Sequence, residues 1–163
     1  MSHQSLSPEE SRCIFCRIVR GAEPAHVIWE DEQHIAFLSI FPNTEGITVV
    51  IPRNHAPSYA FALDQDVYVG LVLAARKVGL VLDRAFDDVG RTAMVLEGFG
   101  VDHVHAKLIP LHGTGSLAEW KPIRSDINTY FTEYRGYVSS HDAEQAPEAT
   151  LSALAERIRR SAR

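Results

Sequence analysis

Two histidines and a lysine recur at alternate positions in residues 101–110: His103, His105 and Lys107. If this segment is a strand, these side chains share one face, and the apolar residues between them face the core. A neutral imidazole is a nucleophile near pH 7, and neighbouring cationic groups stabilise phosphate oxygens. The row therefore indicates attack of an imidazole on phosphorus, followed by hydrolysis of the phospho-imidazole. His105, flanked by two donors, is the expected nucleophile.

A second group with chemical potential is the pair Cys13 and Cys16, a CxxC spacing. Two reduced, half-buried cysteines are also an ordinary feature of a protein core. A zinc site needs two more ligands, and the sequence contains no second CxxC pair or close histidine pair. Any further ligands must therefore come from histidines that are distant in the chain. A redox role is weaker, because the pair does not follow a thioredoxin-like strand.

The elements that position these groups are typical of an α+β domain with an antiparallel sheet. Short β-rich runs separated by turn residues predict five strands, at residues 25–30, 34–38, 47–52, 91–96 and 101–110. Between the third and fourth runs, apolar residues from Val67 to Ala85 repeat at helical spacing. They predict one long helix packed on a face of the sheet. A shorter helix is expected near residues 13–20.

The chain divides into three parts. Residues 1–11 lack periodicity and are expected to form a flexible tail, and residues 12–115 to form the domain. Residues 116–163 are then a C-terminal extension. Its end carries an apolar stripe that predicts a terminal helix: Leu151, Leu154, Ala155 and Ile158. This helix either docks on this chain or on a partner, or it remains a partly frayed tail.

Length and composition exclude several classes of protein. A chain of 163 residues with 45% hydrophobic and 23% charged residues is typical of one soluble domain. Its net charge of −5 argues against a partner that is nucleic acid or an anionic membrane. No apolar run approaches the roughly 20 residues that span a bilayer, and the N-terminus lacks a signal-peptide pattern. Two cysteines cannot form a disulfide framework, so a cytoplasmic domain is expected.

Over residues 12–112 the chain resembles the histidine triad (HIT) family, in particular bacterial-type members that begin with CxxC. The matching segments begin at Cys13, Ile28, Ala36, Gly46 and His103. The resemblance implies the HIT-like fold: a central antiparallel sheet of about five strands with one long and one short helix. It also implies pairing into a homodimer. The substrate it implies is a purine nucleotide or dinucleotide, cleaved through a nucleotidyl-histidine intermediate.

Carried over by position, the resemblance assigns roles to single residues. His103 matches the first triad histidine, and His105 matches the second, which is the family's nucleophile. Five apolar residues match positions that line the nucleobase and ribose pocket, although plain core packing is the alternative for them: Ile14, Phe15, Ile18, Phe37 and Ile40. The resemblance also implies a structural zinc ion held by four residues: Cys13, Cys16, His55 and His103.

Four positions depart from the family's pattern. Lys107 replaces the third triad histidine of the family. Ile47 replaces a histidine that is common in the strand before Ile-Pro. Ser39 stands where the family has an acidic or amide residue that binds the ribose hydroxyls. Gly100 stands where the family usually offers a side chain to the leaving group. A charged lysine is a poor proton shuttle near neutral pH, although it still binds phosphate. These departures indicate a different nucleotide substrate or a slow enzyme.

Three functions therefore stay open from the sequence. The leading one is a hydrolase of nucleoside phosphate derivatives, such as a dinucleoside polyphosphate or a nucleoside phosphoramidate. The second is a nucleotide-binding, regulatory protein with little turnover, which the changes at Lys107, Ile47 and Ser39 favour. The third is a nucleotidyltransferase whose acceptor is not water.

Overall fold

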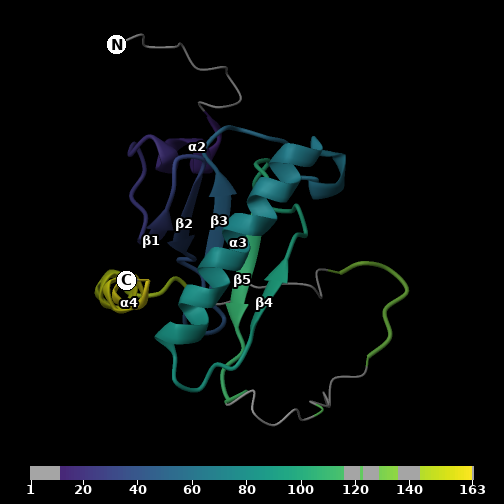
Figure 1. Cartoon of the computed structure of the whole chain (residues 1–163). Coiled ribbons are helices and arrows are strands. Elements are labelled where there is room, and N and C mark those ends of the chain that lie inside the picture. The colour runs from purple at the N-terminus through teal and green to yellow at the C-terminus, as the bar shows by residue number, and fades with distance from the viewer. Residues whose placement is uncertain (1–11, 116–121, 123–128, 136–143, 163) are drawn as a thin grey trace.

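The structure is a computed structural model and describes residues 12–115, 122, 129–135 and 144–162. Its centre is a five-stranded antiparallel sheet with strand order β1-β2-β3-β5-β4 (Figure 1). The strands are β1 (Val27–Glu30), β2 (His34–Leu38), β3 (Thr48–Pro52), β4 (Thr92–Val95) and β5 (Ala106–Pro110). The helices are α2 (Ile14–Val19), α3 (Gln65–Ala85) and α4 (Glu148–Ser161), with a short 3-10 helix, η1 (Ala60–Ala62). The α+β fold expected from the sequence is confirmed.

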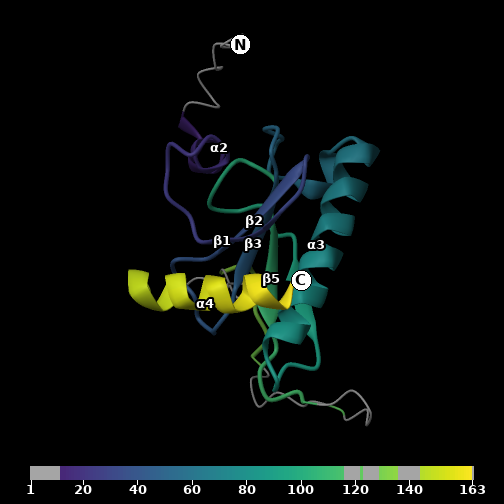
Figure 2. The same cartoon turned by 60° about the vertical axis from the view of Figure 1, so that its left-hand side comes forward.

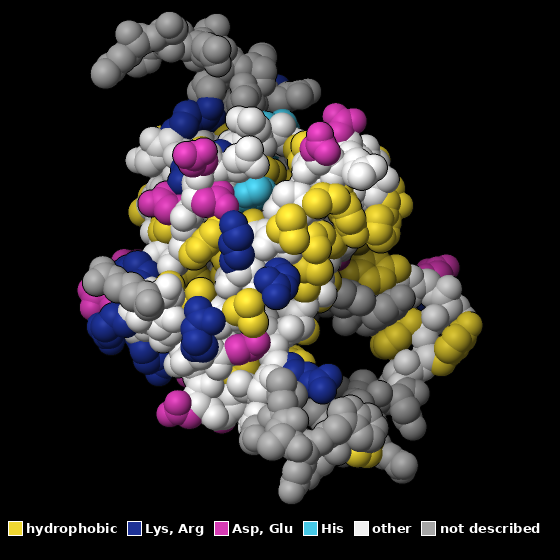
Figure 3. Space-filling model, viewed as in Figure 1, with side chains coloured by type: hydrophobic (Ala, Val, Ile, Leu, Met, Phe, Trp, Pro, Cys, Tyr) yellow, Lys and Arg dark blue, Asp and Glu magenta, His cyan; other side chains and the backbone are white. Residues whose placement is uncertain are grey.

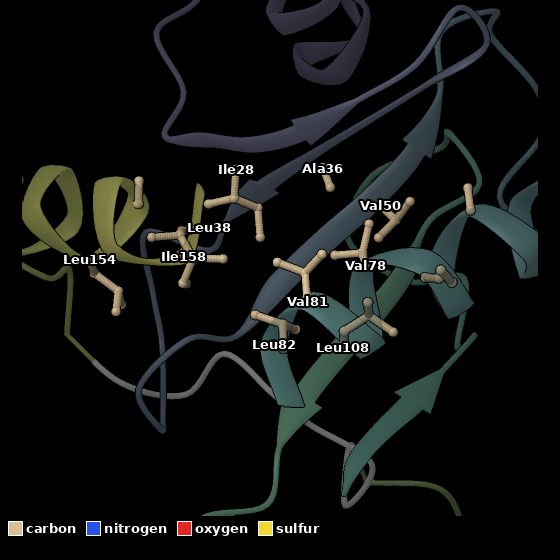
Figure 4. Close-up of a cluster of buried hydrophobic side chains, with 14 of the residues drawn as sticks. Ile28, Ala36, Leu38, Val50, Val78, Val81, Leu82, Leu108, Leu154 and Ile158 are labelled. Atoms are coloured by element: carbon tan, nitrogen blue, oxygen red, sulfur yellow. The ribbon is translucent and has the colours of Figure 1, made fainter. Parts of the chain in front are cut away.

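The helix α3 covers one face of the sheet, and α2 lies near one end of the other face (Figure 2). Six apolar residues of α3 are buried at helical spacing: Leu71, Ala74, Ala75, Val78, Val81 and Leu82. They pack with apolar residues of the strands to form the main core (Figure 4). A smaller core on the opposite face joins α2 to Ile35, Phe37, Val49 and Ile51 of β2 and β3.

The terminal helix α4 lies crosswise at one end of the sheet, against α3 and β1 (Figure 2). Its four apolar residues predicted from the sequence are all buried in the main core (Figure 4). Of the alternatives left open, the structure thus has the helix docked on this chain. The proposed tail, residues 1–11, lies outside the described residues, as does most of the segment between residue 115 and α4.

The fifth strand is shorter than predicted, since β5 begins at Ala106 and residues 101–105 form no ladder with a neighbour. The chain is diverted there because the amide of Val104 donates to the carbonyl of Ala56, at 2.9 Å. The alternation of faces nevertheless continues through this segment. Val104 and Leu108 are buried in the main core, and the histidines and Lys107 lie on the other face.

No helix among the described residues is both long enough and apolar enough to cross a membrane.

Candidate functional site

The imidazole of His105 has a fixed orientation just before β5. Its Nδ1 lies 2.8 Å from the backbone carbonyl oxygen of His103. A carbonyl oxygen only accepts hydrogen bonds, so Nδ1 carries the proton and donates it. The lone pair of the neutral ring is then on Nε2, which is the atom available for nucleophilic attack. The ring is buried, with only 3% of the residue exposed.

An aromatic residue of α2, Phe15, forms the wall beside His105. Its ring centroid lies 5.4 Å from that of His105 and 5.6 Å from that of Phe37, in edge-to-face geometry. Ile18 packs against the same small core as Phe37. The structure therefore brings three of the five predicted pocket residues together next to the predicted nucleophile.

The remaining predicted pocket residues lie elsewhere. Ile14 is 40% exposed and, together with Gly100, lines a cavity of about 510 Å³ beside His55. Gly100 has φ of +88°, a left-handed conformation that favours glycine. Ser39 and Ile40 follow β2 and line cavities together with residues of α4.

The lysine of the row, Lys107, is buried and ion-paired. Its Nζ contacts Oε1 of Glu97, and the two side chains are only 8% and 6% exposed. From the sequence, Lys107 is expected to bind phosphate as a cation, and its pairing with Glu97 is not foreseen. The available signal was an acidic residue directly after the predicted fourth strand. Its pairing became visible only with the register of β4 on β5, which places Val95 opposite Lys107.

A second cluster joins α2 to the loop after β3 and to the turn before β5. It contains one ligand atom each from Cys13, Cys16, His55 and His103, and these atoms all lie within 4.8 Å of one another. The Sγ atoms of Cys13 and Cys16 both lie 3.5 Å from Nδ1 of His103. Sγ of Cys16 lies 3.4 Å from Nδ1 of His55. Two thiolates and two imidazoles at this separation can hold a metal ion.

The orientation of His103 fits a metal ligand. Its Nε2 donates to the backbone carbonyl of Pro52, at 2.9 Å, which leaves the lone pair on Nδ1 facing the cysteines. Burial lowers the pKa of His103 to about 4, so the ring is neutral at pH 7, as a metal ligand must be. The same residue lends its carbonyl oxygen to His105, so the cluster and the nucleophile are directly linked.

A carboxylate that sequence reasoning missed, Asp102, fixes this region. Its Oδ1 accepts a hydrogen bond from the backbone amide of Ser58, at 2.9 Å. This hydrogen bond holds the pKa of Asp102 below its usual range. The turn before β5 is thereby attached to the loop that follows His55.

Comparison with known proteins agrees with this geometry. Residues 20–114 match the HIT domain family, which is more than half of the chain. An uncharacterized HIT-like protein of Methanocaldococcus jannaschii is 32% identical over 133 residues, which cover 76% of this chain and 99% of that protein. An adenosine 5'-monophosphoramidase of Schizosaccharomyces pombe is 32% identical over 98 residues, covering 60% of this chain and 73% of the relative.

Among solved structures, a zinc-bound histidine triad family protein from Mycobacterium smegmatis has the same fold. It superposes with a TM-score of 0.64 at 20% identity and covers 94% of each chain. The family match spans both the sheet and the row that contains His105. The chain belongs to the HIT (histidine triad) family.

Proposed function

We propose that this protein is a nucleotide hydrolase that acts on nucleoside phosphate derivatives through a nucleotidyl intermediate on His105. The observation that carries the proposal is the tautomer of His105, whose Nδ1–H donates to the carbonyl of His103. This leaves Nε2 as the nucleophilic atom. The yeast relative is an adenosine 5'-monophosphoramidase, which supports a nucleoside phosphoramidate as substrate; a dinucleoside polyphosphate is the other expected substrate class.

The reaction proceeds in two displacements. Nε2 of His105 attacks the α-phosphorus and a new N–P bond forms, while the leaving group departs with the electron pair of its bond to phosphorus and takes a proton from solvent. The positive charge that develops on the ring is stabilised by the hydrogen bond from Nδ1 to the carbonyl of His103. Water then breaks the N–P bond, which releases the nucleoside monophosphate and regenerates His105. The ammonium of Lys107 binds the non-bridging oxygens.

The nucleoside lies against the apolar wall next to His105. The rings of Phe15 and Phe37 contact each other, and Ile18 packs beside them, a surface suited to a purine. The remaining predicted pocket residues, Ile14, Gly100, Ser39 and Ile40, line other cavities, so this proposal does not place them in the wall beside His105.

We further propose that the Cys₂His₂ cluster binds a structural zinc ion. The donor set is the one that zinc prefers, and Nδ1 of His103 is oriented by its hydrogen bond to Pro52. A bound ion would be structural, because all four donors come from the protein, and it would tie three segments of the chain together. His103 is held in place as a result, and its carbonyl oxygen sets the orientation of His105.

In this proposal the protein is a cytoplasmic homodimer that binds neither nucleic acid nor membrane. Large apolar side chains are exposed on α3 and on its neighbours: Tyr59, Phe61, Val69, Leu73, Leu80 and Met94. Figure 3 shows hydrophobic side chains gathered over this side of the molecule. Among the described residues β4 is an edge strand of the sheet, and such an edge next to an apolar surface favours a second copy of the chain.

The experiment that tests the hydrolase is a rapidly quenched reaction with adenosine 5'-phosphoramidate, analysed by mass spectrometry. We expect an adenylyl adduct on His105 and the release of AMP. His105→Ala should lower turnover by at least about 10³-fold, because no nucleophile remains. Full turnover by this variant would contradict the mechanism. His26→Ala is the matched control, since His26 lies by α4 and binds Glu148.

The ion pair of Lys107 with Glu97 keeps a second function in view, a nucleotide-binding protein with little turnover. A compensated lysine offers less net positive charge to a phosphoryl group than an unpaired one. This function predicts tight AMP binding without release of AMP from phosphoramidate or dinucleotide substrates. A nucleotidyltransferase would instead turn over only when an acceptor is added.

A further inference from the structure

The face of the sheet that carries His105 and Lys107 also carries Glu97. In the antiparallel register, Val95 lies opposite Lys107. Leu96 packs against the main core, so its neighbours in the chain project from the other face. The ion pair agrees with this placement, since Oε1 of Glu97 contacts Nζ of Lys107. One carboxylate thus stands beside Lys107, on the face that also carries His105.

Burial makes the contact between Glu97 and Lys107 consequential. The two side chains are only 6% and 8% exposed, and Oε1 of Glu97 contacts Nζ of Lys107. A buried ammonium without a counter-charge is strongly unfavourable. Glu97 therefore allows Lys107 to stay charged on this face before any phosphate arrives.

The pair also restricts where the ammonium can lie. A lysine side chain has a flexible four-carbon stem, so its charge has no fixed position of its own. The contact with Glu97 fixes the position of Nζ. An ammonium carries three N–H donors, so it can contact Glu97 and a phosphoryl oxygen at the same time. His105 and Lys107 are two residues apart on one face, about 7 Å along the chain.

We propose that Glu97 is a positioning residue for phosphoryl binding. It holds the ammonium of Lys107 beside the imidazole of His105, where the ammonium meets the non-bridging oxygens of the nucleotide. Glu97 acts through Lys107 and does not itself touch the substrate. This inference rests on the proposed function, because it assumes that the phosphoryl group lies next to His105.

The test is a double-mutant cycle between Glu97→Asp and Lys107→Met. Glu97→Asp keeps the charge but withdraws the carboxylate by one methylene, so the ammonium moves while the local charge stays constant. We expect about a tenfold weaker AMP affinity by calorimetry and about a tenfold lower kcat with adenosine 5'-phosphoramidate, since small misplacements are costly. In the Lys107→Met background, Glu97→Asp should change AMP affinity by less than about twofold.

Two outcomes would overturn the proposal. One is a Glu97→Asp protein with the AMP affinity of the wild type. The other is an equal loss of affinity in both backgrounds, which would indicate a general structural role. If Glu97→Asp does not fold, the same cycle is run with Glu97→Gln. The proposal requires that the effect of Glu97→Gln on AMP affinity also disappears in the Lys107→Met background. Glu30→Asp is the matched control, since Glu30 is an exposed glutamate that is paired with Arg53.

The cycle separates this inference from the proposed function. AMP affinity is measured without turnover, so the result of the cycle does not depend on whether His105 is the nucleophile. A His105→Ala protein that still releases AMP would contradict the nucleophile, while non-additive AMP binding would still support the role of Glu97. A wild-type protein that binds no AMP would overturn both.

Discussion

Next to His105 the structure places two uncharged aromatic side chains and the ion pair of Lys107 with Glu97. Phe15 and Phe37 are neutral, His105 has a fixed tautomer, and Lys107 is balanced by Glu97. In a protein with a net charge of −5, this face gains no long-range attraction for a polyphosphate. Binding must therefore depend on contacts at short range, which is why the position of the Lys107 ammonium matters more than the sum of charges.

A histidine outside the site, His112, controls a pH-dependent part of stability. Its Nε2 donates to the carbonyl of Glu45, at 2.9 Å, and Nδ1 lies 3.1 Å from the carboxylate of Asp88. These two contacts raise the pKa of His112 above its usual value of 6.5, the carbonyl first. Protonated His112 therefore stabilises the fold below pH 6.5, and this contribution is lost as the pH rises through the raised value.

His112→Gln removes the group that is protonated, so its free energy of unfolding is compared with that of the wild type. We expect the wild type to be more stable by urea unfolding at pH 6, with the advantage shrinking toward pH 8. The hydrogen bond with His112 lowers the pKa of Asp88. The contact between the two side chains therefore stabilises the fold only while Asp88 is ionised. Parallel stability curves for the two proteins from pH 6 to 8 would contradict the assignment.

The individual side chains of the site differ in how far the sequence predicts them. The geometry of alternate residues is enough to propose His105 as the nucleophile, which stays a prediction. The resemblance supplies the four clustered ligands, which the structure places together. Glu97 was missed because its partner depends on the register between β4 and β5. A register is set by the packing of whole strands, so no local pattern around Glu97 reveals it.

At the scale of elements, α2 is attached to the sheet through the Cys₂His₂ cluster. Cys13 precedes the helix and Cys16 lies inside it, while His55 and His103 belong to segments far along the chain. A metal ion bound here would add its binding free energy to folding. We predict one zinc per chain by elemental analysis. Chelation should lower Tm and expose both thiols to a thiol reagent.

Cys16→Ser should reproduce the effect of the chelator. It removes a thiolate ligand and leaves three, so both zinc content and Tm should fall. If the purified protein contains no zinc and the chelator does not change its Tm, the cysteines are ordinary core residues and the metal site is contradicted. Cys13 and Cys16 form no disulfide in the structure, so titration of their thiols reports metal occupancy directly.

The helix α4 is docked on the main core through its apolar side chains. Ile158 is fully buried against the main core, whereas Arg160 of the same helix is exposed. Ile158→Ala should lower the free energy of unfolding by about 2–5 kcal/mol, because it leaves a cavity. Arg160→Ala should change it by less than about 0.5 kcal/mol. Equal, small effects in urea unfolding would mean that α4 is frayed in solution.

The elements differ in what their sequence determines. An apolar stripe with period 3.6 predicts α3 and α4 correctly, because amphipathicity is a local property. It does not identify the surface that α4 covers, which in the structure is formed by α3 and β1. The start of β5 was predicted five residues too early. Alternation alone cannot distinguish a hydrogen-bonded strand from an extended segment that donates to Ala56.

Exposed apolar side chains beside β4 are the basis on which we propose a homodimer. A hollow of about 260 Å³ lies between α3 and β4 and is lined by residues that include Leu80 and Met94. These two side chains are 43% and 45% exposed. A stable dimer buries about 800 Å² per partner, and strand β4 with the outer face of α3 offers one continuous surface for this.

We therefore predict a dimer by size-exclusion chromatography with light scattering. Met94→Lys should convert it to a monomer, because the proposed contact would then bury a charge without a partner. Phe41→Lys is the matched control, since Phe41 is 43% exposed but lies in the loop between β2 and β3. A wild type that is monomeric at all concentrations would contradict the second copy. A control that also dissociates would place the interface on another face of the molecule.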